Sequence, residues 1–252
     1  MRCLKVTIAY QGTHYVGWQV QPNGISIQHL LEKAWTCITH EKIRITASGR
    51  TDSGVHALRQ VCSLSTDSQI PAEKIPQALN ANLPFDIRVL EVSEAGDNFH
   101  AIRDATGKTY RYQIQTGQIQ DPFQRDFRWF VPRSLNVRAM QTAAKHLIGR
   151  HDFSSFEAAG APRQDSIRNV KQLLIHETFV NDFKFIDIEI TADGFLYNMV
   201  RNIVGSLIVI GRERQEPSWI QTVLEARNRK QAGETAPAHG LFLVEVEYAT
   251  EA

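Results

Sequence analysis

Cysteine and long apolar runs are both scarce in this sequence, and each scarcity excludes a class of protein. Its three cysteines are scattered and form no Cys-x-x-Cys pair, so neither a disulfide framework nor a structural zinc site is expected. No stretch approaches the roughly 18 uninterrupted apolar residues of a membrane-spanning helix, and the first residues lack the apolar run of a signal peptide. We therefore expect a cytoplasmic protein with reduced thiols, no metal and no membrane span.

The remaining composition is that of an ordinary soluble protein, but its charge is unevenly distributed. With 252 residues, 42% of them hydrophobic and 22% charged, the chain can form one large domain or two of about 100 to 150 residues. Residues 101–171 carry 12 Lys and Arg against 6 Asp and Glu, whereas the residues after them carry 7 against 12. The basic middle predicts phosphate contact and base stacking, unless it is a solvated face with its aromatic rings in the core. Its members are Arg103, Lys108, Arg111, Arg125, Arg128, Arg133, Arg163 and Arg168, with Tyr110, Tyr112, Phe127 and Trp129 between them.

The chemically richest stretch is residues 48–57, which read Ser-Gly-Arg-Thr-Asp-Ser-Gly-Val-His-Ala. In an extended backbone, Arg50 and Asp52 project from the same face. A carboxylate beside a cation stays ionised, which suits a nucleophile better than a general acid. The stretch is neither a phosphate-binding P-loop nor a Gly-x-Ser-x-Gly nucleophile elbow. The alternative is a polar turn in which Asp52 caps a helix or closes an Asx turn, with His56 in a structural role.

The first half of the chain predicts an α+β domain over residues 1–105. Alternating or β-branched runs predict strands at 4–10, 43–46, 60–65 and 87–92. Ser26 can cap a helix whose apolar positions over 27–38 fall on one face, and Pro71 opens a second helix. Helices on one side of a mainly antiparallel sheet would leave an open face of the kind that RNA-binding domains use.

The second half, residues 106–252, repeats this α+β composition. On a strand near 108–112, Tyr110 and Tyr112 share one face. A helix capped by Asn136 and ending at Gly149 is followed by a small-residue loop at 158–163, which we expect to face RNA. Strands at 170–177 and 183–190, a helix at 195–205, a helix from Pro217 and a closing strand near 241–248 complete the prediction.

Arg201 lies inside the predicted helix 195–205, which is apolar almost all round and therefore predicted to be buried. A buried guanidinium is costly unless a carboxylate pairs with it. Arg201 thus requires an acidic partner, for which Asp187 and Glu189 are candidates from the same half of the chain.

Five segments resemble signatures of the tRNA pseudouridine synthase A family. Residues 49–57 match its catalytic pattern Gly-Arg-Thr-Asp-x-Gly-Val-His-Ala, and residues 108–112 resemble its Lys-Thr-Tyr-Arg-Tyr motif. Similar agreement is found at 151–156, in the Phe-x-x-x-Met-Val-Arg run ending at Arg201, and in the Ala-Pro-x-x-Gly-Leu run ending at Leu241. A further segment, which begins at Tyr10, is similar to a family segment that usually begins Tyr-Asp-Gly-Thr, except that Gln11 replaces the acidic residue.

This resemblance implies a pseudouridine synthase fold of two similar α+β domains, 1–105 and 106–252, with an active-site cleft between them. It also implies a homodimer that isomerises uridine to pseudouridine at positions 38–40 of the tRNA anticodon stem-loop, without metal or organic cofactor. In the family the aspartate corresponding to Asp52 is the nucleophile, the arginine corresponding to Arg201 pairs with it, and the tyrosine corresponding to Tyr110 lies against the target base. The expected site residues are Asp52, Arg50 and Arg201 for catalysis and Tyr110, Leu241, Arg103, Arg111 and His56 for substrate binding.

Two other classes of function remain open. A noncatalytic RNA-binding protein could use the same residues, although binding alone does not require a carboxylate that repels phosphate. A glycoside or nucleoside hydrolase usually needs a second carboxylate, and no Asp or Glu lies close to Asp52 in the sequence. Loss of activity on changing Asp52 would separate the catalytic from the noncatalytic reading.

Overall fold

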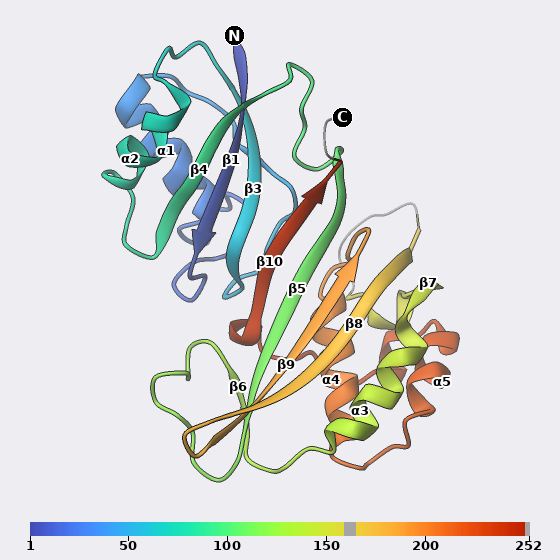
Figure 1. Ribbon diagram of the computed structural model, residues 1–252. Coiled ribbons are helices and arrows are strands. Elements are labelled where there is room, and N and C mark those ends of the chain that lie inside the picture. Colours follow the sequence, from blue (N-terminus) through green and yellow to red (C-terminus); the bar gives the residue numbers. More distant parts are fainter. Residues whose placement is uncertain (159–164, 250–252) are drawn as a thin grey trace. The chain divides into compact units, whose positions relative to one another are not determined.

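The computed structural model describes residues 1–158 and 165–249, which group by contact into two units (Figure 1). Unit 1 consists of Met1–Thr106 and Phe242–Ala252, and unit 2 consists of Gly107–Leu241. Strand β10 (Leu241–Tyr248) therefore belongs almost entirely to unit 1, although its residues fall in the range predicted for the second domain. The domain boundary at 105–106 stays a prediction, and of the predicted RNA-facing loop 158–163 only residue 158 lies among the described residues.

Unit 1 is built on a sheet in which β1 (Arg2–Tyr10) lies between β3 (His56–Thr66) and β4 (Ile87–Ala95). Both pairings are antiparallel, as is that of the two-residue strand β2 (Thr46–Ala47) with β3. Strand β10 instead runs parallel to β3, with Phe242 opposite His56. The end of the chain thus joins the strand that follows the Asp52 stretch.

The helices of unit 1 cover one face of this sheet (Figure 1). They are α1 (Ile27–Thr39), the short 3₁₀ helix η1 (Ala72–Lys74) and α2 (Ile75–Asn80). Ser26 caps α1 as predicted, because its hydroxyl oxygen accepts a hydrogen bond from the His29 amide at 3.3 Å. Leu4 and Ile8 of β1 are fully buried, as are Trp35 of α1 and Ile75 of α2, so these apolar side chains form the core of the unit.

Unit 2 contains the antiparallel series β5 (Ala105–Thr116), β9 (Phe183–Ala192), β8 (Ile167–Val180) and β7 (Gly149–Asp152). A short strand, β6 (Trp129–Val131), runs parallel to β5. Tyr110 and Tyr112 lie opposite Ile190 and Ile188 of β9, and all four side chains are buried. The prediction that the two tyrosines share a face is therefore confirmed.

The α-helices that accompany this sheet in the described part of unit 2 are α3 (Val137–Ala144), α4 (Met199–Gly211) and α5 (Trp219–Ala226). Asn136 caps α3 as predicted, and α3 is followed by the 3₁₀ helix η2 (Lys145–Leu147). Helix α4 begins four residues later than predicted because Asn198 adopts a left-handed backbone, with φ of 59°, immediately before it. The 3₁₀ helices η3 (Ser154–Phe156), η4 (Arg229–Gln231) and η5 (Ala238–Gly240) follow later in the unit.

The fold class is α+β, with mainly antiparallel strand pairing. The mainly antiparallel sheet predicted from the sequence is confirmed, and the strands β10 with β3 and β6 with β5 pair in parallel. Parallel neighbours require a long connection between the strands, and for β3 and β10 that connection contains all of unit 2. Within residues 1–158 and 165–249, no helix combines the length and the apolar character needed to cross a membrane.

Candidate active site

The stretch containing Asp52 is a loop between β2 and β3 that is fixed at its start by a buried glutamine. The Ser48 amide donates to the Val61 carbonyl at 2.8 Å, and the Ser48 hydroxyl donates to Gln60 Oε1 at 2.6 Å. Gln60 Nε2 donates in turn to the Gly49 carbonyl at 2.9 Å. One fully buried amide side chain therefore satisfies both a hydroxyl and a carbonyl of the loop.

The residues on either side of Asp52 are held by the last residue of β1 and by the segment that follows it. The Trp18 amide donates to the Thr51 carbonyl at 3.0 Å, the Thr51 and Tyr10 hydroxyls are 2.8 Å apart, and the Ser53 hydroxyl donates to the Tyr15 carbonyl at 3.1 Å. Burial raises the pKa of Tyr10, so this phenol stays protonated and available for its hydrogen bond. The position of the Asp52 backbone is thus determined from both neighbours.

Asp52 itself is half-buried, whereas Arg50 is exposed. The turn after Asp52 is closed through its backbone carbonyl, which accepts from the Val55 amide at 3.1 Å. Gly54 has φ of +79° in this turn, a conformation that favours glycine. The turn is therefore closed by a backbone hydrogen bond. Its closure does not require the Asp52 carboxylate, and the role of that carboxylate as a nucleophile stays a prediction.

His56, at the start of β3, has a structural environment. The Gly12 amide donates to His56 Nδ1 at 3.0 Å, which assigns the ring proton of the neutral imidazole to Nε2. The ring also stacks on Phe242 of β10, with centroids 4.6 Å apart and planes at 23°. Only 1% of the side chain is exposed. These contacts favour the structural interpretation of His56, and its role in substrate binding stays a prediction.

Arg201 lies in unit 2, in the first turn of α4. Its guanidinium donates to the Ala236 carbonyl at 2.7 Å and to Asn198 Oδ1 at 2.7 Å, while the Ala236 amide donates to the Arg201 carbonyl at 3.1 Å. The two candidate carboxylates from the same half pair elsewhere, Asp187 with Arg128 at 2.9 Å and Glu189 with Arg111 at 2.6 Å. The pairing of Arg201 with Asp52 stays a prediction.

The segment 236–241 connects two of the expected site residues of unit 2 and packs against Tyr112. Arg201 holds its first residue, and Leu241, which is buried, is its last. Between them, the Pro237 carbonyl accepts from the Tyr112 hydroxyl at 2.7 Å, and Gly240 lies so close that an added Cβ would come 2.7 Å from the Tyr112 ring. Tyr110 is two residues from Tyr112 on the same face and meets Phe195 edge-on, at 4.9 Å between centroids.

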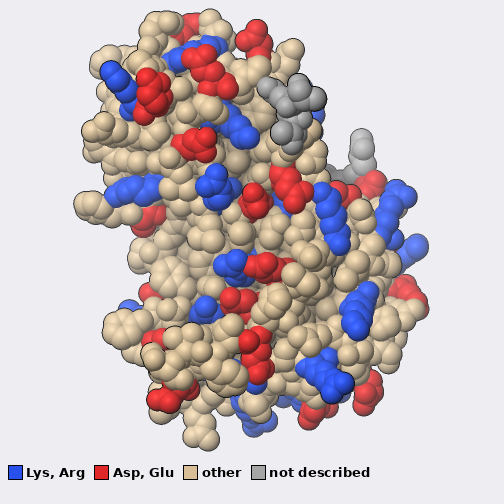
Figure 2. All heavy atoms as spheres, viewed as in Figure 1, with Lys and Arg blue, Asp and Glu red and all other residues tan. Residues whose placement is uncertain are grey.

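The basic middle segment is largely neutralised by neighbouring carboxylates. Arg103 pairs with Asp104 at 2.9 Å, Arg111 and Arg128 pair with the two acids of β9, and Arg125 lies 3.7 Å from Asp126. Figure 2 shows acidic and basic side chains interspersed over the face in view. Arg163 lies outside the described residues. Phosphate binding by Arg103 and Arg111 stays a prediction. It requires each guanidinium to leave its carboxylate, or to bind the carboxylate and a phosphate at the same time.

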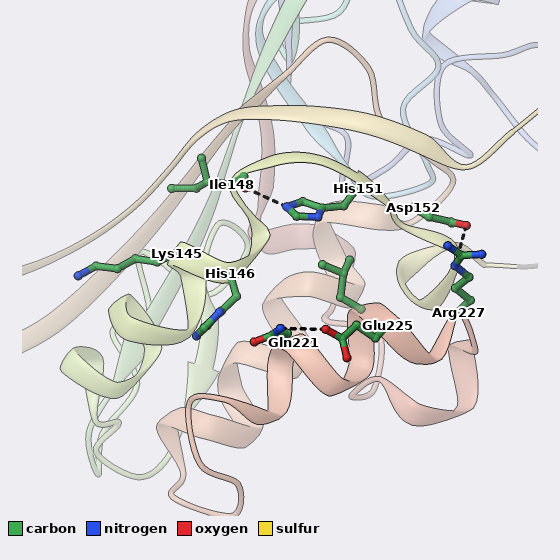
Figure 3. A pocket seen from close by; sticks show the side chains of 9 residues that line it. Lys145, His146, Ile148, His151, Asp152, Gln221, Glu225 and Arg227 are labelled. Atoms are coloured by element: carbon green, nitrogen blue, oxygen red, sulfur yellow. Dashed lines mark hydrogen bonds and ion pairs between the residues drawn. The ribbon is translucent and has the colours of Figure 1, made fainter.

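A pocket of about 600 Å³ in unit 2 is separate from these residues (Figure 3). Its wall includes Asp152, whose pKa is lowered by hydrogen bonds from Ser154 and by the Arg227 guanidinium at 3.3 Å. The wall carries charges of both signs, and no site residue predicted from the sequence lines it. Its members are Lys145, His146, Ile148, His151, Asp152, Gln221, Leu224, Glu225 and Arg227.

Sequence reasoning missed a polar cluster behind Arg201. The next residue of α4, Asn202, is completely buried and accepts hydrogen bonds from Arg229 at 2.9 Å and from Thr235 at 2.7 Å. The only signal in the sequence was a buried-face asparagine in an apolar helix, which must find hydrogen-bond partners.

Among the described residues, no group of three or more His, Cys, Asp or Glu side chains is arranged to hold a metal ion.

The comparison with known proteins agrees with the motifs in these segments. A family model described as tRNA pseudouridine synthase matches residues 6–103 and 143–249. The chain belongs to this family. The tRNA pseudouridine synthase A of Moorella thermoacetica is 47% identical over 250 residues, which cover 98% of this chain and 100% of the relative. The enzyme of the same name from Thermoanaerobacter sp. strain X514 is 42% identical over 248 residues, with coverages of 98% and 100%.

Both matched parts of the family model contain expected site residues. Residues 6–103 include the Asp52 loop and its supporting segment, and residues 143–249 include Arg201 and Leu241. Tyr110 lies in the interval between them. Among solved structures, a Cbf5–Nop10–Gar1 complex aligns over 81% of this chain and 45% of that chain, with a TM-score of 0.36 and 9% identity.

Proposed function

We propose that this tRNA pseudouridine synthase isomerises uridine to pseudouridine at positions 38–40 of the tRNA anticodon stem-loop, with Asp52 as the nucleophile. The observation that carries the proposal is the Asp52 loop, in which the family's pattern Gly-Arg-Thr-Asp-x-Gly-Val-His-Ala occurs at 49–57 and both neighbours of Asp52 are hydrogen-bonded. Holding a reactive group at one position lowers the entropy cost of reaching the transition state. The loop therefore has the rigidity that a nucleophile requires.

The reaction itself sets what the residues must do. The bond between uracil N1 and C1′ breaks, the base turns, and a bond forms between uracil C5 and C1′, while the C5 proton is lost and N1 gains one. The atoms balance without a redox centre, so the proposal includes no metal and no organic cofactor. A carboxylate near the sugar and the base supplies the nucleophile, and an enclosed pocket limits hydrolysis.

Tyr110 is proposed to lie against the flipped uracil. Stacking of a base on an aromatic ring contributes about 1–3 kcal/mol, which offsets much of the few kcal/mol needed to unstack the base. The edge-on contact with Phe195 supports this role, because it fixes the plane of the Tyr110 ring before the base arrives. Leu241 is proposed to line the same pocket.

The remaining roles in the proposal concern charge. We assign to Arg201 the pairing with the Asp52 carboxylate, which would keep that carboxylate ionised, and to Arg50 a further catalytic role beside it. Arg103 and Arg111 would meet backbone phosphates of the tRNA. His56 would support the loop next to the substrate.

The arrangement of the chain is also part of the proposal. We expect two similar α+β domains, 1–105 and 106–252, with the active-site cleft of the pseudouridine synthase fold between them, and a homodimer that works in the cytoplasm, where mature tRNA is used. The mass of the protein in solution, measured with and without tRNA, tests the dimer.

A tritium-release assay tests the activity. Transcribed tRNA labelled with tritium at uracil C5 loses the label when C5 bonds to C1′, so wild-type protein should release tritium from positions 38–40. Asp52→Asn should abolish the release and retain tRNA affinity, because the amide has the shape of the carboxylate but cannot act as the nucleophile. Asp97→Asn, at an exposed aspartate of unit 1, is the matched control and should remain active.

The outcomes separate the proposal from its rivals. Tight tRNA binding without release by the wild-type protein would indicate a noncatalytic RNA-binding protein. Release of free uracil would indicate a hydrolase. Residual isomerisation by Asp52→Asn, above the background of a clean preparation, would refute the assignment of the nucleophile.

A further inference from the structure

Segment 236–241 ends a longer loop that begins after η4, and the first part of that loop is held by a single guanidinium. Arg229 donates to the Gly233 carbonyl at 2.8 Å and to the Thr235 hydroxyl at 3.0 Å. It also donates to Asn202 Oδ1 at 2.9 Å. A planar fork with several fixed donors can satisfy acceptors in two elements at once, and lysine cannot reproduce that geometry.

The acceptor Asn202 links this loop to the helix turn that carries Arg201. Its Oδ1 accepts from both Arg229 and Thr235, and its Nδ2 donates to the Phe156 carbonyl at 2.8 Å. Because Asn202 is completely buried, each of these bonds replaces one that water would otherwise make. The cluster is therefore a fixed junction between α4, η3 and the loop.

The backbone of the loop lies directly on α4. A Cβ added to Gly205 would come 1.7 Å from the Glu234 carbonyl oxygen, so no side chain separates the two backbones. The Gly233 amide donates to the Ser206 hydroxyl at 2.9 Å, and that hydroxyl donates to the Asn202 carbonyl at 2.8 Å. The loop is thus located over one turn of the helix, and any shift of 232–235 is transmitted to Ala236, which exchanges two hydrogen bonds with Arg201.

We propose that Arg229, together with Asn202 and Thr235, is a positioning residue for the isomerisation: the cluster fixes loop 232–236 on α4 and thereby sets the orientation of the Arg201 guanidinium and the place of Leu241. The proposal rests on the proposed function, since it takes Arg201 and Leu241 to be parts of the active site. Arg229 acts through these residues, and it is not itself assigned a contact with substrate.

The test compares Arg229→Met with Arg227→Met. Arg227 is exposed and pairs with Asp152 at 3.3 Å, so its substitution removes the same group two residues away and leaves the hydrogen bonds from Arg229 to the loop in place. Tritium release is measured well below the melting temperature of each variant. Arg229→Met should lower kcat roughly 10- to 100-fold, the effect of a misplacement approaching 1 Å, with KM for tRNA within about threefold. Arg227→Met should change neither.

The exchange rates of backbone amides give a second test of the proposal that does not depend on activity. In Arg229→Met the amides of 233–241, including that of Ala236, should exchange faster than in the wild type, while the interior amides of α4 keep their protection. In addition, millimolar guanidinium ion should restore part of kcat to Arg229→Ala, because it can occupy the space and the acceptors of the missing fork.

Thr235→Val covers the case in which removal of Arg229 prevents folding. This variant deletes the hydroxyl that donates to Asn202 and accepts from Arg229, and it should lower kcat in the same direction but less. A kcat within about twofold of wild type in a folded Arg229 variant, or in Thr235→Val when no Arg229 variant folds, overturns the proposal. No release by the wild type would instead refute the proposed function, and the exchange data would still report on the loop.

Discussion

Gly17→Ala should disturb the Asp52 loop without changing any group that could do chemistry. Gly17 has φ of +102°, and a Cβ added there would lie 2.7 Å from the Thr51 carbonyl oxygen and 3.1 Å from Asp52 C. These neighbours are backbone atoms of the loop, so they cannot rotate away as a flexible side chain would. The loop must move by roughly 0.7 Å to restore an ordinary contact distance to the Thr51 carbonyl oxygen.

Two contributions to the stability loss can be separated with a matched glycine. The left-handed backbone alone costs alanine about 1–2 kcal/mol, and overpacking adds about 1–3 kcal/mol, giving roughly 2–5 kcal/mol for Gly17→Ala. Gly117 has φ of +137° with nothing within 4 Å of an added Cβ, so Gly117→Ala should lose only the first contribution. Gly96, which also has open space and no such φ, should tolerate alanine.

Urea unfolding measures the free energies, and tritium release measures kcat. Because a misplacement of 1 Å costs about 100-fold, a shift of roughly 0.7 Å should lower kcat of Gly17→Ala roughly 10- to 100-fold, with little change in KM. Gly117→Ala should keep wild-type kcat. Equal stability losses in the two variants, with kcat unaffected in both, would refute the argument that Gly17 makes room for the loop.

Three further predictions concern charge. A double-mutant cycle of Asp52→Asn and Arg201→Met should show a coupling in unfolding free energy above about 0.5 kcal/mol, and additive effects would contradict their pairing. Arg111→Gln should reduce the slope of log affinity for tRNA against log salt by about 1, whereas Glu189→Gln should raise affinity, because it releases the Arg111 guanidinium; unchanged affinity and slope would place Arg111 on a solvated face. Asp152→Asn should lower stability at pH 7, and the deficit should vanish as the pH falls below the ordinary Asp value of 3.8, because hydrogen bonds from Ser154 depress the folded pKa and the stabilisation is lost on protonation. A deficit that persists in acid, measured by urea unfolding, would contradict this cause.

The predictable parts of the fold are those determined by local chemistry. Ser26 and Asn136 cap their helices because a short side-chain oxygen can satisfy an amide of the first turn, and both were identified from the sequence. The alternation of Ile186, Ile188 and Ile190 likewise specified the buried face of β9. Such signals depend only on neighbours in the sequence.

The wrong boundaries come from contacts between residues distant in the sequence. The apolar run from Phe195 was predicted as helix from its first residue, but Phe195 packs on the Tyr110 ring and Asn198 turns the backbone to meet Arg201. Strand β6 was not predicted, since its three residues become a strand only by pairing with β5. Local periodicity cannot report either event.

The candidate site divides in the same way. Asp52, Arg201 and segment 236–241 were found because their neighbours form extended motifs. The Asn202, Arg229 and Thr235 cluster was missed because its members are common polar residues, 27 and 33 positions from Asn202. Only the approach of the loop to α4 brings them together, and the sequence contains no spacing that encodes it.

The parallel pairing of β10 with β3 has a consequence for synthesis of the chain. On the ribosome, β3 is complete when about 66 residues have been made, yet its partner begins at Leu241, after all of unit 2. During that interval β3 is paired with β1 and β2 but lacks β10 along its first residues, and an incomplete strand edge can recruit foreign strands. A nascent chain stalled before Leu241 should therefore depend on a chaperone more than the finished protein does.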